Sequence, residues 1–250
     1  MSDTIVWISG ATSGIGLGLA RNCPYKDARI INLSRRIHPD LESVRLDLTD
    51  PKTIDTVRRH FEEELANFRG QRALFIQNAV VPIIYGFVGE IPASDHRDQL
   101  VGIGVAPLVL GEAFVRAAAT TPRTCDTGLV MLTSTAARNA YEGGAPYNAA
   151  KAAIEHWVRT VRRERALRDA RPWLCALEPG FVDTPGSRDC AATVDPRDYP
   201  SVAHVREAFE AGQGFDDIDT VARATWAALP RGGPQDAVLL FRGGAVQAAI

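Results

Sequence analysis

Tyr147 and Lys151 have the residue types of a proton-transfer pair, and Ser134 lies thirteen residues before Tyr147. If residues 143–154 form a helix, side chains four apart lie on one face, one turn from each other. A phenol has an ordinary pKa of about 10, and an ammonium ~4 Å away favours the phenolate by roughly 4 kcal/mol at an effective dielectric near 20. The spacing therefore predicts a tyrosine with a lowered pKa that gives or takes a proton near neutrality. The alternative is an ordinary tyrosine and an exposed lysine.

Three glycines follow the first apolar run, in the segment WISGATSGIGLGLA. Gly10, Gly14 and Gly16 suit a sharp turn from a strand into a helix, where the backbone must approach a pyrophosphate. The amides at the helix start would then point at the phosphates, whose charge the helix dipole favours. A glycine triplet also fits a plain tight turn, but its place after the first strand of a strand–helix–strand pattern favours a dinucleotide site.

The end of the next apolar run bears on which dinucleotide binds. A free 2′-hydroxyl is usually held there by Asp or Glu, about 20 residues past the glycines, whereas this segment reads NLSRR. Ser34, Arg35 and Arg36 offer a hydroxyl and two guanidinium groups, and a guanidinium matches a phosphate but cannot accept a hydrogen bond as a carboxylate does. We therefore predict NADP(H) rather than NAD(H); the alternative is two exposed arginines in a loop.

Short apolar runs alternate with helical patterns along the whole chain. The runs are typical of strands covered on both faces, and they span residues 4–9, 28–33, 43–46, 73–77, 128–133, 173–177 and 237–241. Capping residues and apolar spacing predict helices over 50–68, 106–119 and 148–170. The alternation predicts an α/β fold, a doubly wound parallel sheet of about seven strands (a Rossmann fold) in one domain over 1–250. We expect a substrate-binding excursion at 185–214, the alternative being a disordered connection.

Charge and composition argue against several classes of protein. Thirty acidic and 28 basic residues give a net charge of −2, which argues against a dedicated nucleic-acid or membrane-surface protein. The four cysteines form no CxxC pair and the histidines have no metal-ligand spacing, so we predict neither a disulfide framework nor a metal site. The first residues lack a signal-peptide pattern and no run reaches about 18 apolar residues, so we expect a cytoplasmic protein without a membrane segment.

Together the motifs resemble the short-chain dehydrogenase/reductase family over almost the whole chain. They are SGATSGIG (9–16), LDLTD (46–50), QNAV (77–80), Ser134, the YxxxK pair of Tyr147 and Lys151, and PGFVDT (179–184). Within the family, the similarity is greatest, though faint, to benzil-reductase and sepiapterin-reductase members. The resemblance implies that Ser134, Tyr147 and Lys151 are catalytic. The cofactor contacts that it implies are Gly10, Thr12, Ser13, Gly14, Ile15 and Gly16 at the pyrophosphate and adenosine ribose, Asp47 and Leu48 at the adenine, Asn78 and Ala79 at the centre, Pro179, Gly180, Val182 and Thr184 at the nicotinamide, and Tyr147 and Lys151 beside its ribose.

The resemblance also implies a reaction. NADPH would pass a hydride to a ketone or aldehyde, Tyr147 would protonate the oxygen, Ser134 would hold it, and Lys151 would lower the pKa of Tyr147. The implied partners are a small carbonyl or alcohol substrate and further copies of the chain in a homodimer or homotetramer. The sequence departs from the family at Val80, where the family has glycine, and at Ile103, where it has an asparagine that helps to hold a water near the lysine. These departures keep open an NADP(H)-binding sensor or scaffold with little turnover; an epimerase or dehydratase using bound cofactor is a third possibility.

Overall fold

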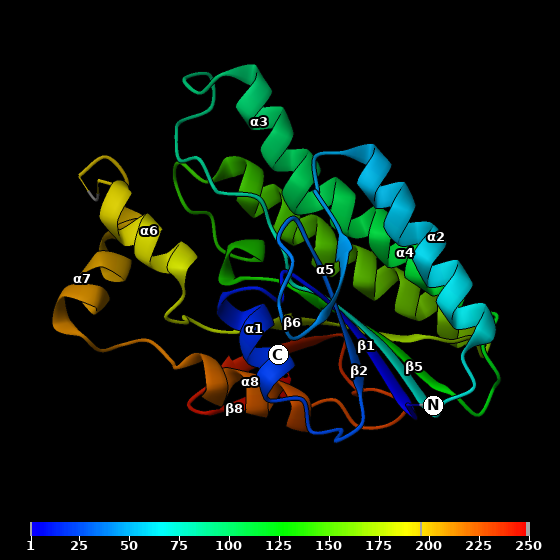
Figure 1. Cartoon of the computed structure of the whole chain (residues 1–250). Helices are drawn as coiled ribbons and strands as arrows, with labels where there is room; N and C mark the ends of the chain where they lie inside the picture. The colour runs from blue at the N-terminus through cyan, green and yellow to red at the C-terminus, as the bar shows by residue number, and fades with distance from the viewer. Residues whose placement is uncertain (1, 196, 249–250) are drawn as a thin grey trace.

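A mostly parallel sheet of eight strands forms the centre of the computed structural model, which describes residues 2–195 and 197–248 (Figure 1). The strand order is β3-β2-β1-β4-β5-β6-β7-β8, and only β8 runs antiparallel to its neighbour. The strands are β1 (Thr4–Ser9), β2 (Arg29–Ser34), β3 (Glu42–Arg45), β4 (Arg72–Gln77), β5 (Asp126–Leu132), β6 (Trp173–Glu178), β7 (Val238–Arg242) and β8 (Ala245–Ala248). Because the order steps outward from β1 in both directions, the sheet is doubly wound, and the predicted fold class is confirmed.

The predicted strands agree with β1–β7 to within two residues. Every residue of β1 and β4 is buried, which explains their unbroken apolar runs. The sequence analysis missed β8, which pairs with β7 through a turn at Gly243 and Gly244, both of positive φ. This glycine pair is a hairpin signal that the sequence contained.

Helices cover both faces of the sheet (Figure 1). One face carries α2 (Pro51–Asn67), α4 (Ala106–Ala118) and α5 (Ala145–Leu167), and the other carries α1 (Gly14–Arg21) and α8 (Ile218–Ala227). On the first face, the buried rings of Trp7, Phe61 and Phe114 meet edge to face with centroids 5.4–6.0 Å apart. The three predicted helices correspond to α2, α4 and α5.

The excursion at 185–214 is largely helical. It consists of α6 (Pro185–Thr193), a 3₁₀ turn at Pro200–Val202 and α7 (Ala203–Ala211), which stand apart from the main body beyond one end of the sheet (Figure 1). Thr184 and Ser187 form a reciprocal capping box at the start of α6, which has Pro185 in its first turn. Pro185 and Pro200 thus each occupy the first position of a helical segment.

One helical stretch is long and apolar enough to cross a membrane by length and composition. It runs from Ala93 to Ala118 through α3 (Ala93–Leu100), a π-helical turn (Val101–Val105) and α4, with a mean hydropathy of 1.7 in its best window. Because 61% of that window is buried against the rest of the fold, its apolar character is that of a core helix.

Candidate functional site

A cavity of about 770 Å³ opens at the carboxyl ends of β1, β2, β4, β5 and β6. Ligands of open α/β sheets bind in this crevice. The predicted site residues that line it are Gly10, Thr12, Ser13, Gly14, Ile15, Ser34, Arg35, Arg36, Asp47, Leu48, Asn78, Ala79, Ser134, Tyr147, Lys151, Pro179, Gly180, Val182 and Thr184. Gly16, the remaining predicted residue, is buried under the glycine loop. The structure therefore brings together segments that are spread between residues 10 and 184 of the sequence.

The glycine loop is packed too tightly for side chains at two positions. Gly10 has φ +74°, and a Cβ there would lie 3.0 Å from Nδ2 of Asn78. A Cβ on Gly16 would lie 2.3 Å from the carbonyl oxygen of Gly10. Glycine is therefore required for the chain to turn from β1 into α1 at this distance.

The start of α1 offers hydrogen-bond donors to the cavity. Ser13 is the N-cap residue, yet its side chain makes no capping hydrogen bond, and the first turn carries no acidic residue. The first amides of a helix lack intrahelical partners and lie at the positive end of its dipole. A phosphate-bearing group fits this donor set.

Arg35 and Arg36 follow β2 and line the same end of the cavity, but they make different contacts. Arg36 donates through Nη2 to the hydroxyls of Thr12 and Ser13, both at 3.1 Å. Arg35 is exposed, lines the cavity and is one of the charges acting on Asp47. Hydrogen bonds from Thr49, chiefly from its backbone N–H, hold the pKa of Asp47 below its usual value, with help from Arg35. The loop after β2 thus places two positive charges where the sequence predicts the 2′-phosphate of NADP(H).

Ser134, Tyr147 and Lys151 meet in the cavity from two elements. Ser134 follows β5, and its hydroxyl accepts from the N–H of Ala136 at 3.2 Å. Tyr147 and Lys151 lie in the first two turns of α5, with Lys151 Nζ 5.5 Å from the centre of the Tyr147 ring. Lys151 is only 4% exposed, and Nζ donates to the carbonyl oxygen of Leu132 at 2.9 Å.

The predicted lowering of the Tyr147 pKa by Lys151 is wrong for the protein without ligands. Burial raises the pKa of Tyr147 above 10 and the charge of Glu178 adds to it, whereas a hydrogen bond with Ser134 acts in the opposite direction. Burial also lowers the pKa of Lys151 to about 8. Burial thus favours the neutral phenol of Tyr147 and the neutral amine of Lys151.

The Lys151 pKa predicts a pH dependence of stability. Between about pH 8 and pH 10.5 the unfolded chain binds more protons at Lys151 than the folded chain does, so the free energy of unfolding should rise with pH. Relative to Lys151→Met, the wild type should gain about 3 kcal/mol across this window, measured by urea unfolding of the cofactor-free protein. The exposed Lys52 gives the control, Lys52→Met, whose stability should follow that of the wild type. Parallel curves for the wild type and Lys151→Met would contradict the depressed pKa.

Asn148, next to Tyr147, is a site residue that the sequence analysis missed. Its Nδ2 donates to the carbonyl oxygen of Tyr141 at 3.0 Å, but its buried Oδ1 has no hydrogen-bond partner in the described chain although the residue lines the cavity. Ile103, at the family's asparagine position, is fully buried in the π-helical turn and does not reach the cavity. Val80 lines the cavity and is 41% exposed. Asn148, which lines the cavity, therefore carries an unpaired polar atom, whereas Ile103 contributes no polar group there.

The far part of the cavity has an aromatic wall. It includes Tyr85, Tyr141 and Phe181, together with His204 and Cys190 from the excursion. The Phe181 and His204 rings meet edge to face at 6.3 Å, and Cys190 donates to the Tyr85 hydroxyl at 3.4 Å.

A buried ion network lies beside the catalytic candidates. The carboxylates of Glu155 on α5 and Glu178 at the end of β6 are 6% and 1% exposed. Arg138 forms ion pairs with both, and Arg242 pairs with Glu178 at 2.5 Å. Thr133, the residue before Ser134, donates to Glu155 at 3.1 Å. The network therefore ties together the elements that carry Ser134, Tyr147 and Pro179.

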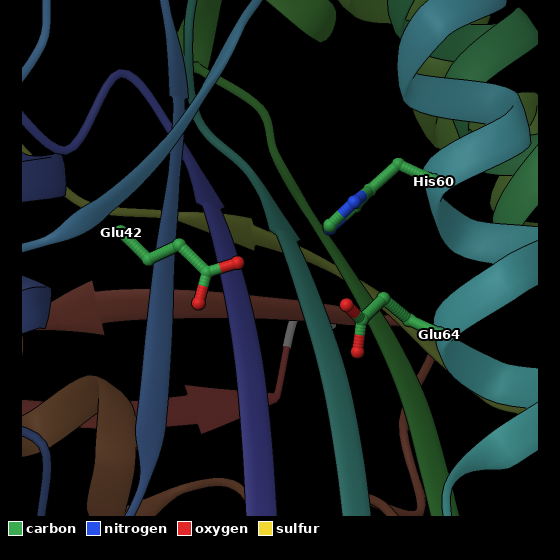
Figure 2. A group of neighbouring side chains, drawn as sticks. All are labelled: Glu42, His60 and Glu64. Atoms are coloured by element: carbon green, nitrogen blue, oxygen red, sulfur yellow. The ribbon is translucent and has the colours of Figure 1, made fainter.

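Three potential metal ligands gather away from the cavity, at Glu42, His60 and Glu64 (Figure 2). Arg29 donates to both oxygens of Glu42 at 2.6–2.7 Å and to both oxygens of Glu64 at 2.5–2.9 Å. Since a guanidinium already satisfies these carboxylates, we interpret the group as an arginine–carboxylate cluster.

Comparison with known proteins agrees with the geometry of the cavity. The family model described as short chain dehydrogenase matches residues 4–195. A benzil reductase ((S)-benzoin forming) of Bacillus subtilis is 25% identical over 184 residues, which cover 71% of this chain and 74% of the relative. The solved structure of the KRED1-Pglu enzyme has a TM-score of 0.76 at 18% identity, covering 97% of this chain and 99% of that one. A short chain dehydrogenase from Burkholderia cenocepacia in complex with NADP has a TM-score of 0.70 at 20% identity, covering 97% and 90%.

Proposed function

Because the chain belongs to the short-chain dehydrogenase family, and so to the oxidoreductases, we propose that it reduces a ketone or aldehyde to an alcohol with NADPH. One observation carries the proposal: Ser134, Tyr147 and Lys151 line the same cavity as the glycine loop. A hydroxyl, a phenol and an amine next to a phosphate-binding turn suit hydride transfer coupled to protonation.

In the proposed reaction, NADPH supplies the hydride. Tyr147 gives its proton to the developing alkoxide, and its raised pKa means that it carries that proton at neutral pH. Ser134 donates a hydrogen bond to the same oxygen and fixes its position. Lys151, with a pKa of about 8, is able to exchange a proton close to neutral pH and so to recharge the phenol.

The preference for NADP(H) over NAD(H) rests on the charge at the end of β2. Arg35 lines the cavity without a carboxylate partner in the described chain, and Arg36 spans the glycine loop. No acidic residue follows Ser34 at the position that would hold a free 2′-hydroxyl. The Burkholderia relative of similar fold contains NADP, which agrees with this choice.

Replacing Arg35 by Ala should weaken NADPH binding by about 10- to 100-fold, because a charge-assisted hydrogen bond contributes about 1.5–3 kcal/mol. NADH lacks the 2′-phosphate, so its affinity should change little. Titration calorimetry with both cofactors measures the two dissociation constants. Arg45→Ala is the matched control, since Arg45 is also exposed and acts on Asp47 but does not line the cavity. Equal losses for NADPH and NADH would contradict the proposed selectivity.

The aromatic wall favours a carbonyl compound with an apolar body. Tyr85, Tyr141 and Phe181 offer ring faces for packing around the position of the reacting group. The Bacillus relative is named for forming (S)-benzoin, an aryl ketol, which is consistent with such a wall. The test is NADPH oxidation with aromatic and aliphatic ketones and aldehydes, including benzil.

The alternative is an NADP(H)-binding sensor or scaffold, which Ile103 favours because its buried apolar side chain supplies no polar group beside Lys151. Tight NADPH binding without turnover of any carbonyl compound would support it.

A homodimer or homotetramer is also part of the proposal. Exposed Val105, the last residue of the π-helical turn, and Val109 on α4 offer apolar surface for it. The Trp157 ring on α5 packs against Gly111 of its own chain.

A further inference from the structure

A second hollow, of about 460 Å³, lies at the opposite end of the sheet from the cofactor cavity. It is bounded by the starts of β5 and β6, the last turns of α5 and the loop at 232–234. The parallel strands all begin at one end of the sheet and finish at the other (Figure 1). The starts of β5 and β6 line this hollow, so the length of β5 separates it from the catalytic candidates. Its volume is within the range of small-molecule sites.

Four arginines line this hollow, namely Arg123, Arg162, Arg165 and Arg171. Arg123 pairs with Asp169 at 3.6 Å, but both side chains are largely exposed. Within residues 2–195 and 197–248, no carboxylate lies within 4.0 Å of the other three guanidinium groups. The hollow therefore holds a concentration of positive charge that the protein itself leaves uncompensated.

Two of these guanidinium groups are fixed by backbone carbonyl groups. Arg162 donates to the oxygen of Leu174 at 2.6 Å and to that of Gln235 at 2.5 Å. Arg171 donates to the oxygens of Thr121 and Cys125 at 2.8 and 2.9 Å. Carbonyl groups hold the guanidinium planes in place without removing their charge, so the wall is pre-organised for an anion.

Among the described residues that line the hollow, the one acid, Asp126, already has partners. Asp126 forms a buried ion pair with Arg72 at 3.0 Å, and it also accepts from the indole N–H of Trp173 at 2.8 Å. Arg72 does not line the hollow. The net charge that faces the hollow is therefore positive.

Two donors on the wall have no acceptor. The hydroxyl of Thr127, a residue only 1% exposed, has no hydrogen-bond partner in the described chain. Arg165 is half-buried, and no hydrogen bond or ion pair of its guanidinium occurs among the described residues; burial lowers its pKa. Because buried polar groups are nearly always paired, the free hydroxyl of Thr127 calls for an acceptor from outside the chain, and the free guanidinium of Arg165 lines the same hollow.

We propose that this hollow is a binding site for a phosphate group, either as the free ion or as the phosphate end of a small metabolite. A phosphate presents several strong acceptor oxygens, which match the free fork of Arg165, and its charge is attracted by the fixed guanidinium charges of Arg162 and Arg171. The unpaired hydroxyl of Thr127, at the start of β5, adds a further donor on this wall. The site is independent of the proposed NADPH reaction, since it shares no residue with the cofactor cavity.

Binding of inorganic phosphate is the test, measured by titration calorimetry at constant ionic strength with the wild-type chain. Arg165→Gln should weaken phosphate about tenfold or more, and Thr127→Val by up to about tenfold. Arg168→Gln is the matched control, because Arg168 is an exposed arginine that caps α5 but does not line the hollow. It should leave the affinity within about twofold, since an exposed charge contributes little.

The glycine loop also fits a phosphate, so Arg35→Ala is measured in parallel. The hollow is supported if phosphate binding survives Arg35→Ala and is weakened by Arg165→Gln. It is refuted if the wild type does not bind millimolar phosphate, if Arg165→Gln has no effect, or if Arg165→Gln and Arg168→Gln weaken binding equally. Competition by glucose 6-phosphate, but not by glucose, would distinguish capture of a phosphate end from capture of the free ion alone. Circular dichroism checks that each variant is folded.

Discussion

Replacing Tyr147 by Phe should lower kcat for carbonyl reduction by about 10²- to 10⁴-fold, the usual contribution of a positioned general acid. The variant keeps the ring beside Lys151 and loses only the hydroxyl, so the packing at the start of α5 is preserved. NADPH affinity should change by less than about tenfold, because one neutral hydrogen bond contributes about 0.5–1.5 kcal/mol. Steady-state kinetics with the best carbonyl substrate and a separate NADPH titration measure the two effects.

Tyr141 offers the matched control for Tyr147. It lines the same cavity, and its hydroxyl bonds to that of Thr135 at 3.1 Å. Tyr141→Phe removes a phenol from the same cavity but no proton donor for the reaction, so kcat should fall by at most about tenfold. If Tyr147→Phe retained most of the turnover, or if both variants lost equal activity, the role of Tyr147 as the acid would be refuted.

The local features of the site were predictable because each depends on a short segment. The turn at Gly10 and Gly16 needs glycine for steric reasons that act over a few residues. Asp50 and Pro51 start α2 as predicted, with the Asp50 side chain accepting from the N–H of Lys52. The buried strands also follow from apolar runs, because parallel sheets are covered on both faces. The loops after β4, β5 and β6, by contrast, were assigned to the site from the resemblance to a known family and not from such local signals.

The protonation of Tyr147 was not predictable, because it depends on burial and on residues distant in the sequence. A spacing of four residues suggested an attraction between phenolate and ammonium, yet burial favours the neutral form of both groups. Glu178, thirty-one residues after Tyr147, adds to the effect. The ion network of Arg138 likewise joins residues separated by 17 and 40 positions. No local pattern encodes such a pairing.

Arg138→Met should reduce the free energy of unfolding by about 3–5 kcal/mol, because it leaves two buried carboxylates without their shared partner. Glu155 and Glu178 lie in the interior, and Arg242 and Arg159 contact them only from more exposed positions. Methionine retains most of the apolar length of arginine, so the loss reports mainly on charge. Urea unfolding monitored by circular dichroism measures it.

Arg159→Met is the control, since Arg159 is half-exposed and pairs with Glu155 at 3.5 Å; it should cost at most about 1 kcal/mol. Adding Glu155→Gln to Arg138→Met should recover part of the loss, because one buried charge is then removed. A loss no larger than that of Arg159→Met, or a double variant less stable than Arg138→Met, would contradict the charge argument. The network would then serve only to pack the ends of β5, β6 and α5, and the position of Tyr147 would depend on apolar contacts alone.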